Sequence, residues 1–417
     1  MRHRTLLAIL VLLVALTGIA VGTIIQTERP DGELQVSWIS DTARDVGGNH
    51  HAPAVNVVEG EAMVYAPISG RSNSDECELA ALDAENGAHQ WGYKIPAPDC
   101  AIHSVADPIV ADYDSDGTDE VLAATTENQL IAYDPVSGDV EFTYELTSYG
   151  YTQPVVSDVV GDDRPEIVVV DVSGTVFVAR GNGSTVWTRQ LDSYTWGQPS
   201  VADFDGDGHP EVAVGAGGSG QLHLFEHNGT NAWDEPLQFD GSITWMTTGE
   251  ADGDASTEIV VATALGGVVA AVDGSSGETI WARDLGSFAA VNSVADGDAD
   301  GVEEVYAVAN DGSLHSLDAQ TGQTEWTTTL TDSEVQMMPP PSVGDVDGDG
   351  ELELVAVTHD GIVSLVDPRT GEISSTYERK DVIFTNPTLA DVDGDGNVEV
   401  FVMYGRGRVV AFDVATR

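Results

Sequence analysis

Carboxylate side chains recur at a fixed spacing along most of this chain. In one stretch, Asp345, Asp347 and Asp349 alternate with small or apolar residues. Gly350 then permits a tight bend, and Glu353 begins a run of apolar residues soon after it. Carboxylates at this spacing can converge on one point and offer an all-oxygen site to a hard cation, which takes about six to eight oxygen ligands. The spacing therefore predicts a calcium-binding loop.

The same frame recurs in four further complete copies. They are Asp112, Asp114, Asp116 and Glu120; Asp203, Asp205, Asp207 and Glu211; Asp296, Asp298, Asp300 and Glu304; and Asp391, Asp393, Asp395 and Glu399. An EF-hand loop places its glutamate twelfth and lies between helices. Here the glutamate comes ninth and strand-like residues follow it. We therefore exclude an EF-hand and expect hairpin loops that each hold a structural Ca²⁺ ion.

Two more copies are altered. The first keeps four carboxylates but has Ala255 at the bend; its members are Glu250, Asp252, Asp254 and Glu258. In the second, Val160 replaces an aspartate; its remaining members are Asp158, Asp162 and Glu166. We expect weak cation binding by the first and none by the second. The chain should then hold about five or six structural Ca²⁺ ions.

The charge balance is typical of proteins from high-salt environments. The formal net charge is -54, and Lys94 and Lys380 are the only lysines. Six divalent ions would offset only about 12 of these charges. Such self-repulsion opposes a compact state unless salt screens it, and at about 1 M salt the Debye length falls to roughly 3 Å. We therefore expect a halophilic protein, and nucleic acid and anionic membrane surfaces are disfavoured as partners.

The N-terminal segment predicts a membrane anchor. Residues 5–25 are uncharged and mostly apolar and follow the basic flank at residues 1–4. That length can span a bilayer, and no clean cleavage site precedes Gln26, so we favour an uncleaved anchor over a signal peptide. The basic flank should stay in the cytoplasm. The linker 26–32 and the body 33–417 would then lie outside the cell, or be secreted if the segment is cleaved.

Each acidic loop is followed by strand-like runs, a small-residue turn and an aromatic residue. The aromatic falls four residues after the turn glycine in Gly87/Trp91, Gly183/Trp187, Gly229/Trp233, Gly277/Trp281 and Gly322/Trp326, with Phe142 after Gly138. Aromatic residues at such a constant spacing predict a structural packing element between neighbouring repeat units.

The repeat length indicates a β-propeller. Successive acidic loops begin 45 to 49 residues apart, and each interval holds four short strands, which is the size of a propeller blade. An earlier unit from Pro53 has the strands without the loop, which makes eight units. The eighth lacks its outer strand, and residues 33–38 can supply it. We therefore predict an all-β, eight-bladed propeller of four-stranded blades over 33–417, closed by the N-terminal strand.

The motifs resemble two known families. The turns of the form Asp-Ala-x-Thr-Gly-x-x-x-Trp, as at 318–326, are similar to those of PQQ-like (quinoprotein-type) eight-bladed propellers. The Asp-x-Asp-x-Asp-Gly loops resemble the integrin-α-like FG-GAP or VCBS repeats. The strand order puts the acidic loops on one face of the ring. The resemblance implies assembly-factor or adhesion propellers, which present a face to another protein or to glycans.

The opposite face contains the candidate ligand-binding residues. Polar or aromatic residues just before each first strand should point toward the mouth of the central channel, where convergent polar groups can bind a ligand. These residues are His51, Asp107, Gln153, Gln198, Trp245, Asn292 and Asn386, with Trp196 nearby. Trp196 and Trp245 stand outside the structural aromatic position. Their free faces could stack on sugars or on partner side chains.

The cysteines and histidines bear on the enzyme alternative. Catalytic quinoproteins usually carry an adjacent cysteine pair, whereas Cys77 and Cys100 are 23 residues apart and should form a disulfide on one face. His103 is interpreted as a surface histidine without a partner. We therefore expect a membrane-anchored, calcium-stabilised binding or scaffold module for protein or glycan partners. The alternative is a quinoprotein-like dehydrogenase or a polysaccharide-active enzyme on the same fold.

Overall fold

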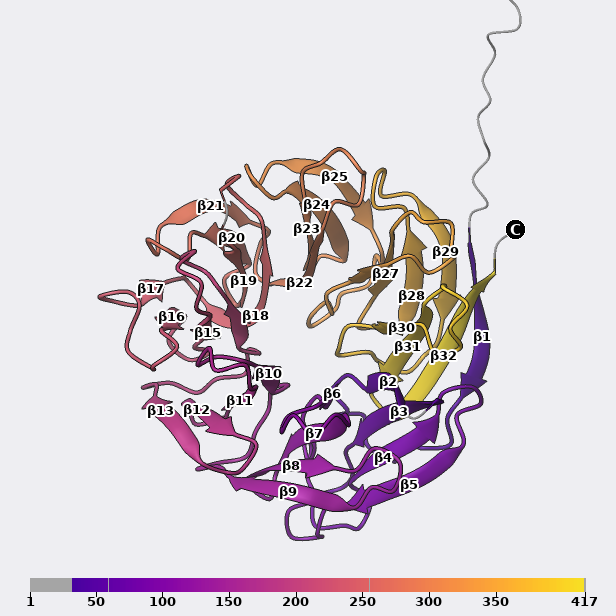
Figure 1. Cartoon of the computed structure of the whole chain (residues 1–417). Coiled ribbons are helices and arrows are strands. Elements are labelled where there is room, and N and C mark those ends of the chain that lie inside the picture. The colour runs from indigo at the N-terminus through magenta and orange to yellow at the C-terminus, as the bar shows by residue number, and fades with distance from the viewer. Residues whose placement is uncertain (1–31, 59, 255, 416–417) are drawn as a thin grey trace, which may run out of the picture.

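The structure, a computed structural model, describes residues 32–58, 60–254 and 256–415. These residues form a ring of eight four-stranded sheets around a central channel (Figure 1). The predicted all-β, eight-bladed propeller is therefore confirmed. The predicted anchor at 5–25, its basic flank and nearly all of the linker lie outside the described residues. The described part of the chain contains no helix that is long and apolar enough to cross a membrane.

The first four blades are built from consecutive strands, from the channel outward. Blade one contains β2 (Ala54–Val58), β3 (Glu61–Ile68), β4 (Glu78–Asp83) and β5 (His89–Lys94); blade two contains β6 (Ile109–Ala111), β7 (Glu120–Thr125), β8 (Gln129–Tyr133) and β9 (Val140–Glu145); blade three contains β10 (Val155–Ser157), β11 (Glu166–Val170), β12 (Thr175–Arg180) and β13 (Thr185–Gln190); blade four contains β14 (Ser200–Ala202), β15 (Glu211–Gly215), β16 (Gln221–Phe225) and β17 (Leu237–Gln238).

The last four blades follow the same order, except that blade eight takes its outer strand from the other end of the chain. Blade five contains β18 (Ser242–Gly249), β19 (Glu258–Ala264), β20 (Val268–Val272) and β21 (Thr279–Asp284); blade six contains β22 (Ala289–Ala295), β23 (Glu304–Ala309), β24 (Ser313–Asp318) and β25 (Thr324–Thr329); blade seven contains β26 (Ser342–Gly344), β27 (Glu353–Val357), β28 (Ile362–Val366) and β29 (Ile373–Glu378); blade eight contains β30 (Thr388–Ala390), β31 (Glu399–Tyr404), β32 (Arg408–Ala415) and β1 (Glu33–Ile39).

The N-terminal strand β1 closes the ring. It pairs antiparallel with β32 from Glu33 opposite Ala415 to Ile39 opposite Val410 (Figure 1). This pairing covers the edge of β32, which would otherwise expose unpaired backbone groups. The closure predicted from the missing eighth outer strand is thus confirmed.

Burial along the strands explains their composition. The second strand of a blade, such as β11, is buried along its whole length because neighbouring blades cover both faces of the sheet. This accounts for continuous Val, Ile and Ala runs in place of alternation. The outer strand alternates between exposed and less exposed residues, as β9 does, because one of its faces meets solvent. The hydrophobic core therefore lies between blades.

The tryptophans in or just before the outer strands join neighbouring blades, as predicted. Each indole Nε1 donates a hydrogen bond to a carbonyl in the turn between the third and fourth strands of the next blade. The pairs are Trp38 to Ala84 (2.6 Å), Trp91 to Pro135 (2.9 Å), Trp187 to His227 (3.0 Å), Trp233 to Gly274 (2.8 Å), Trp281 to Ala319 (2.5 Å) and Trp326 to Pro368 (2.7 Å). Six of the eight junctions between the described blades are therefore latched by a tryptophan, including the closure.

The turn glycines make room for these indoles. At Gly138, φ is +74° and an added Cβ would lie 2.5 Å from the ring of Trp91. At Gly322, φ is +62° and an added Cβ would lie 2.6 Å from the ring of Trp281. The turn glycine of one blade thus packs directly against the tryptophan of the preceding blade.

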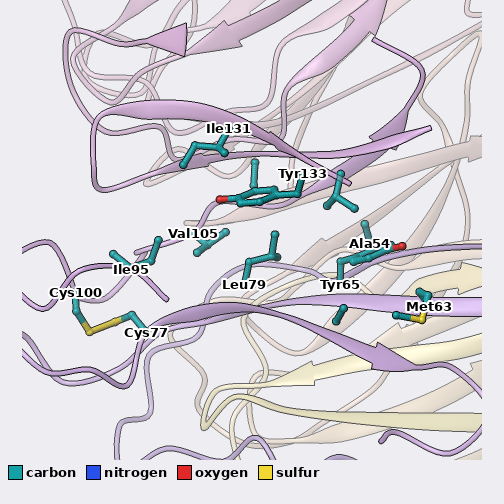
Figure 2. Close-up of a cluster of buried hydrophobic side chains, with 13 residues drawn as sticks. Ala54, Met63, Tyr65, Cys77, Leu79, Ile95, Cys100, Val105, Ile131 and Tyr133 are labelled. Carbon is teal, nitrogen blue, oxygen red and sulfur yellow. A yellow bond between two sulfur atoms is a disulfide. The ribbon is translucent and has the colours of Figure 1, made fainter. Parts of the chain in front are cut away.

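One core cluster, between blades one and two, includes the disulfide. Figure 2 shows Tyr65, Leu79 and Tyr133 packed together, with Cys77 and Cys100 at the end of the cluster. The Cys77–Cys100 disulfide joins the connection between β3 and β4 to the crossing between β5 and β6. Their Cα atoms lie 5.5 Å apart. The pairing is the one expected from the sequence.

Two local features differ from the predicted pattern. The outer strand of blade four, β17, contains only two residues, because Pro236 lacks an N–H and interrupts the pairing after Trp233. The inner strands β18 and β22 begin earlier than expected and contain bulges. Trp245 and Asn292 therefore lie inside strands, and their predicted position just before the first strand is wrong.

Candidate functional site

A cavity of about 500 Å³ lies at the mouth of the central channel, on the face opposite the acidic loops. We call it the mouth cavity. It is lined by seven of the eight candidate ligand-face residues: Asp107, Gln153, Trp196, Gln198, Trp245, Asn292 and Asn386. A second cavity of about 380 Å³ continues between the inner strands and shares Asp107, Gln153, Gln198, Asn292 and Asn386 with the first. His51 lies behind the wall and is only 1% exposed.

Amide side chains form part of the cavity floor. Gln198 Nε2 donates to Gln153 Oε1 at 3.0 Å, and Gln153 Nε2 donates to the carbonyl of Pro108 at 2.8 Å. This chain of hydrogen bonds links blades four, three and two. It fixes the amides in place, and it leaves each with further donor or acceptor capacity toward the cavity.

Aromatic side chains form one wall. Trp196 stacks on Tyr151 with ring centroids 5.8 Å apart and contacts Tyr194 at 4.8 Å. Trp245 meets the edge of Phe288 at 5.2 Å. The expectation that both tryptophans present free faces is therefore only partly right: Trp196 remains 43% exposed, whereas Trp245 is held by its neighbour.

The rim of the cavity is apolar. Leu265, in the connection between β19 and β20, is 87% exposed beside Trp196 and Trp245 on the cavity lining. Sequence reasoning missed Leu265, Tyr151, Tyr194 and Phe288, because the connections on this face do not repeat between blades. Their only signal was an unusual density of aromatic residues outside the repeat position.

A cluster of three histidines stands at the edge of the mouth cavity. His51 Nδ1 lies 2.8 Å from Asp107 Oδ2, and His51 Nε2 lies 3.2 Å from His103 Nδ1. The ring of His50 lies 4.6 Å from that of His103, and the Tyr151 ring lies 4.7 Å from it. The interpretation of His103 as a surface histidine without a partner is wrong, because the crossing between blades one and two folds it back onto His51.

Burial keeps two of these imidazoles neutral. Desolvation, with a smaller contribution from His51 and His359, lowers the pKa of His50 to about 4. Desolvation, with a smaller contribution from His51 and His50, lowers the pKa of His103 to about 2. Both rings are therefore uncharged near neutral pH, and each has a nitrogen lone pair.

The acidic loops join the first and second strands of their blades, as predicted. In each loop the glutamate begins the second strand and is held by the loop backbone. Glu211 Oε2 accepts a hydrogen bond from the N–H of Phe204 at 2.8 Å, and Glu304 Oε2 accepts one from Gly297 at 2.9 Å. The bend glycine closes the loop, since the N–H of Gly208 donates to Asp203 Oδ2 at 3.0 Å.

The second oxygen of these glutamates points to a cation. It is buried and has no hydrogen-bond partner among the described residues in Glu120, Glu211, Glu258 and Glu304. The same holds for Glu166 of the altered loop, whose free oxygen lies 3.6 Å from the guanidinium of Arg180. A buried carboxylate oxygen without a partner is costly. An ion bound between the loop carboxylates would remove that cost, and oxygen-only ligands suit Ca²⁺ or Mg²⁺.

The structure brings most of the predicted ligands together. In at least five loops of the described chain, carboxylate oxygens lie within 4.8 Å of one another: Asp296, Asp298, Asp300 and Glu304; Asp112, Asp114 and Glu120; Asp203, Asp205 and Glu211; Glu250, Asp252 and Glu258; and Asp345, Asp347 and Glu353. Asp116, Asp207, Asp254 and Asp349 stand outside these sets, and each of them accepts a hydrogen bond from the N–H two residues on.

The loop of blade eight shows the same backbone pattern. The N–H of Gly396 donates to Asp391 at 3.2 Å, that of Asp395 to Asp393 at 3.1 Å, and that of Val392 to Glu399 at 2.9 Å. Ala255, the altered bend residue of blade five, lies outside the described residues.

The altered loop of blade three has an arginine side chain beside its carboxylates. Arg180, at the end of β12, places Nη1 2.8 Å from Asp162 and Nη2 3.6 Å from Glu166. The guanidinium thus stands beside the carboxylates where an ion would bind in the other loops. The expectation that this loop binds no metal rests only on the missing aspartate, and no sequence pattern predicted that Arg180 would reach it.

We expect the calcium dependence of stability to grow with pH. Desolvation, together with neighbouring carboxylates, raises the pKa of Glu211 and Glu304 to about 7 and that of Glu353 to about 8. In metal-free protein these groups stabilise the fold at low pH and lose that contribution as pH rises through the raised pKa. A bound cation favours the ionised form and reverses the effect.

The measurement is the melting temperature with calcium and with chelator at several pH values. The difference between the two should increase from about pH 5 to about pH 8. A difference that stays constant over this range would contradict the assignment of these glutamates as cation ligands.

The comparisons with known proteins show the family. The chain matches the family model described as outer membrane protein assembly factor BamB over residues 12–233 and 211–417, and it belongs to that family. No curated protein sequence matches the chain.

Many solved structures share the fold, including the following three. BamB from Moraxella catarrhalis is 19% identical, with a TM-score of 0.59, over 86% of this chain and 93% of that protein. The V. cholerae biofilm matrix protein Bap1 is 14% identical, with a TM-score of 0.68, over 91% of each chain. The quinohemoprotein alcohol dehydrogenase ADHIIG from Pseudomonas putida HK5 is 12% identical, with a TM-score of 0.62, over 95% of this chain and 78% of that protein.

Proposed function

We propose that this protein is an extracellular scaffold whose mouth cavity binds an extended segment of a partner protein. The observation that carries the proposal is the combination of amide and aromatic side chains in one cavity of about 500 Å³. Amide groups match the alternating donors and acceptors of an extended peptide backbone. Exposed aromatic side chains such as Trp196 are typical anchors at protein interfaces.

The charge of the chain supports recognition through uncharged groups. A formal net charge of -54 repels acidic partners at long range, and salt screens that field within a few ångströms at high concentration. The candidate residues on the cavity wall, apart from Asp107, are neutral amides and aromatics. Apolar and hydrogen-bonding contacts persist at high salt, so the cavity suits binding in a halophilic setting.

We further propose that Ca²⁺ ions hold the acidic loops, in the manner of FG-GAP or VCBS repeats. The support is the buried, unpartnered oxygen of Glu211 and its counterparts, together with Arg180 beside the altered loop. Because the loop recurs between the same two strands of successive blades, its role is structural. A catalytic ion would occur once and leave a coordination position open.

The proposed placement is a single-pass membrane protein. Residues 5–25 would anchor the chain, 26–32 would form the linker, and the propeller 33–417 would lie outside the cell. A short linker would keep one face of the ring near the membrane. Cleavage of the segment would instead release the propeller.

The test is site-specific photo-crosslinking in intact membranes. A photoreactive residue at Leu265, on the rim of the mouth cavity, should capture one partner protein. The same residue at Val136, which is also exposed but lies in a turn on the opposite face, should not. The captured segment, made as a peptide, should bind the purified propeller, and Trp196→Ala should weaken binding by about tenfold or more.

Three outcomes would overturn the proposal. Equal capture at both positions would mean that the cavity is not the docking site. Crosslinked material that is degraded by glycosidases, not proteases, would make the ligand a glycan. An organic cofactor in the absorption spectrum of the purified protein would favour the quinoprotein-like enzyme.

A further inference from the structure

We propose that His50, His51 and His103 bind one transition-metal dication of the Zn²⁺ type at the edge of the mouth cavity. This site goes beyond the proposed scaffold function and is separate from the acidic loops, because its donors are imidazole nitrogens and it lies on the opposite face. Imidazole suits Zn²⁺, Cu²⁺ or Ni²⁺, whereas Ca²⁺ prefers carboxylate and carbonyl oxygens.

The distance between two ring nitrogens fits a shared metal ion. His51 Nε2 and His103 Nδ1 lie 3.2 Å apart and share one hydrogen bond. Two nitrogens bound to a tetrahedral Zn²⁺ ion at about 2.0–2.1 Å each are separated by about 3.3 Å. The two nitrogens therefore already have the separation that the ion requires, and the ion takes the place of the proton between them when His103 changes tautomer.

The other nitrogen of His51 contacts a carboxylate, as the second nitrogen of metal-binding histidines commonly does. Its Nδ1 lies 2.8 Å from Asp107 Oδ2, and the other oxygen of Asp107 accepts the N–H of Ala52 at 2.6 Å. The carboxylate is thus fixed at both oxygens and orients the His51 ring. This carboxylate–histidine pair directs the Nε2 lone pair toward His103 and raises its basicity as a ligand.

The backbone at His103 directs its ring into the cluster. Its φ is +67°, a left-handed conformation that is uncommon for residues other than glycine. The N–H of His103 donates to Ser69 Oγ at 3.2 Å and holds this conformation. Unusual backbone angles of this kind concentrate at functional sites, where the surrounding structure holds them in place.

His50 is the third candidate ligand by the position of its ring, and it links the site to the cavity. Its ring lies 4.6 Å from the His103 ring and packs against Phe384 at 3.9 Å. It also lines the mouth cavity. Three histidines leave one position of a tetrahedral ion for water or a group of a bound ligand, as in open zinc sites. The metal could then be reached from the cavity.

The experiment titrates ZnCl₂ into the full chain with Ca²⁺ in large excess, so that the acidic loops are saturated. Calorimetry should show one tight Zn²⁺ site per chain. His103→Asn should lose this site, and asparagine tolerates the left-handed backbone. Asp107→Asn should weaken binding by about 10- to 100-fold. His315→Gln, a partly buried histidine of β24, is the matched control and should bind as the wild type does.

Co²⁺ in place of Zn²⁺ gives a second measurement. The wild type should show visible absorption bands of a tetrahedral site, and His103→Asn should not. Circular dichroism and the calcium-dependent melting temperature confirm that each variant is folded. If the wild type binds no Zn²⁺ under excess Ca²⁺, or if folded His103→Asn binds it equally well, the histidines form only a hydrogen-bonded cluster and the proposal is wrong. Neither result bears on partner capture at Leu265.

Discussion

Removing calcium at low ionic strength is expected to lower the melting temperature steeply. Without a cation, the carboxylates of each loop repel one another, and the buried oxygens of Glu120, Glu211, Glu258 and Glu304 stay without a partner. Free calcium at about 100 times the dissociation constant adds roughly 2.7 kcal/mol for each independent site. With several sites in one ring, the sum is comparable to the whole stability of a typical domain. High salt should restore part of the loss by screening.

Two matched variants separate ion binding from general charge repulsion. Glu304→Gln removes a carboxylate from a complete loop and should reduce the calcium-dependent rise in melting temperature. Glu166→Gln removes the equivalent carboxylate from blade three, where Arg180 provides the positive charge, and should leave that rise unchanged. Metal analysis should find about five or six ions per chain. An unmoved melting temperature after chelation, or fewer than about three ions, would contradict structural calcium.

Truncating a latch tryptophan should have the largest effect of any single substitution. Trp281 is buried, donates to the carbonyl of Ala319 at 2.5 Å and covers the turn glycine Gly322. Trp281→Ala leaves a cavity between blades five and six. It should lower the free energy of unfolding by about 3–5 kcal/mol. Denaturant unfolding in saturating calcium measures this change without interference from the loops.

The control is Trp196→Ala, which removes an indole of equal size from the exposed wall of the mouth cavity. Its effect on unfolding should be well under 1.5 kcal/mol, about the value of an aromatic pair. Gly322→Ala tests the same contact through its other residue. The added Cβ would lie 2.6 Å from the Trp281 ring, and φ at this position is +62°. Gly322→Ala should therefore also lower the free energy of unfolding. Equal losses for the two tryptophan variants would show that the latch has no special role.

The repeated features could be predicted from the sequence because each repeat has the same residue types at the same spacing. The spacing of the acidic loops defined a blade, and a second strand such as β11 is apolar throughout because neighbouring blades cover it on both sides. Residues 33–38 could be assigned to blade eight because that blade lacked an outer strand and carried no tryptophan of its own. Local errors arose where a single residue broke the pattern, as Pro236 does before β17.

The candidate sites were predicted unevenly. Residues that precede the inner strands, such as Gln153, could be placed at the channel mouth because the repeat fixes which end of the strand they occupy. Tyr151, Tyr194 and Leu265 could not, because the connections on that face have no repeat to align. Arg180 lies 14 residues after Glu166, and only the pairing of β11 with β12 brings the two side chains together.

By itself, the sequence determined the number of blades, the position of the acidic loops and the tryptophan latches, because these depend on spacing within a repeat. Only the tertiary structure decided what meets at the channel mouth. His51, His103 and Asp107 come from two crossings that occur once each, and they meet because closing the ring turns those crossings toward the same edge. Contacts between single, non-repeated segments depend on long-range packing, which leaves no periodic trace in the sequence.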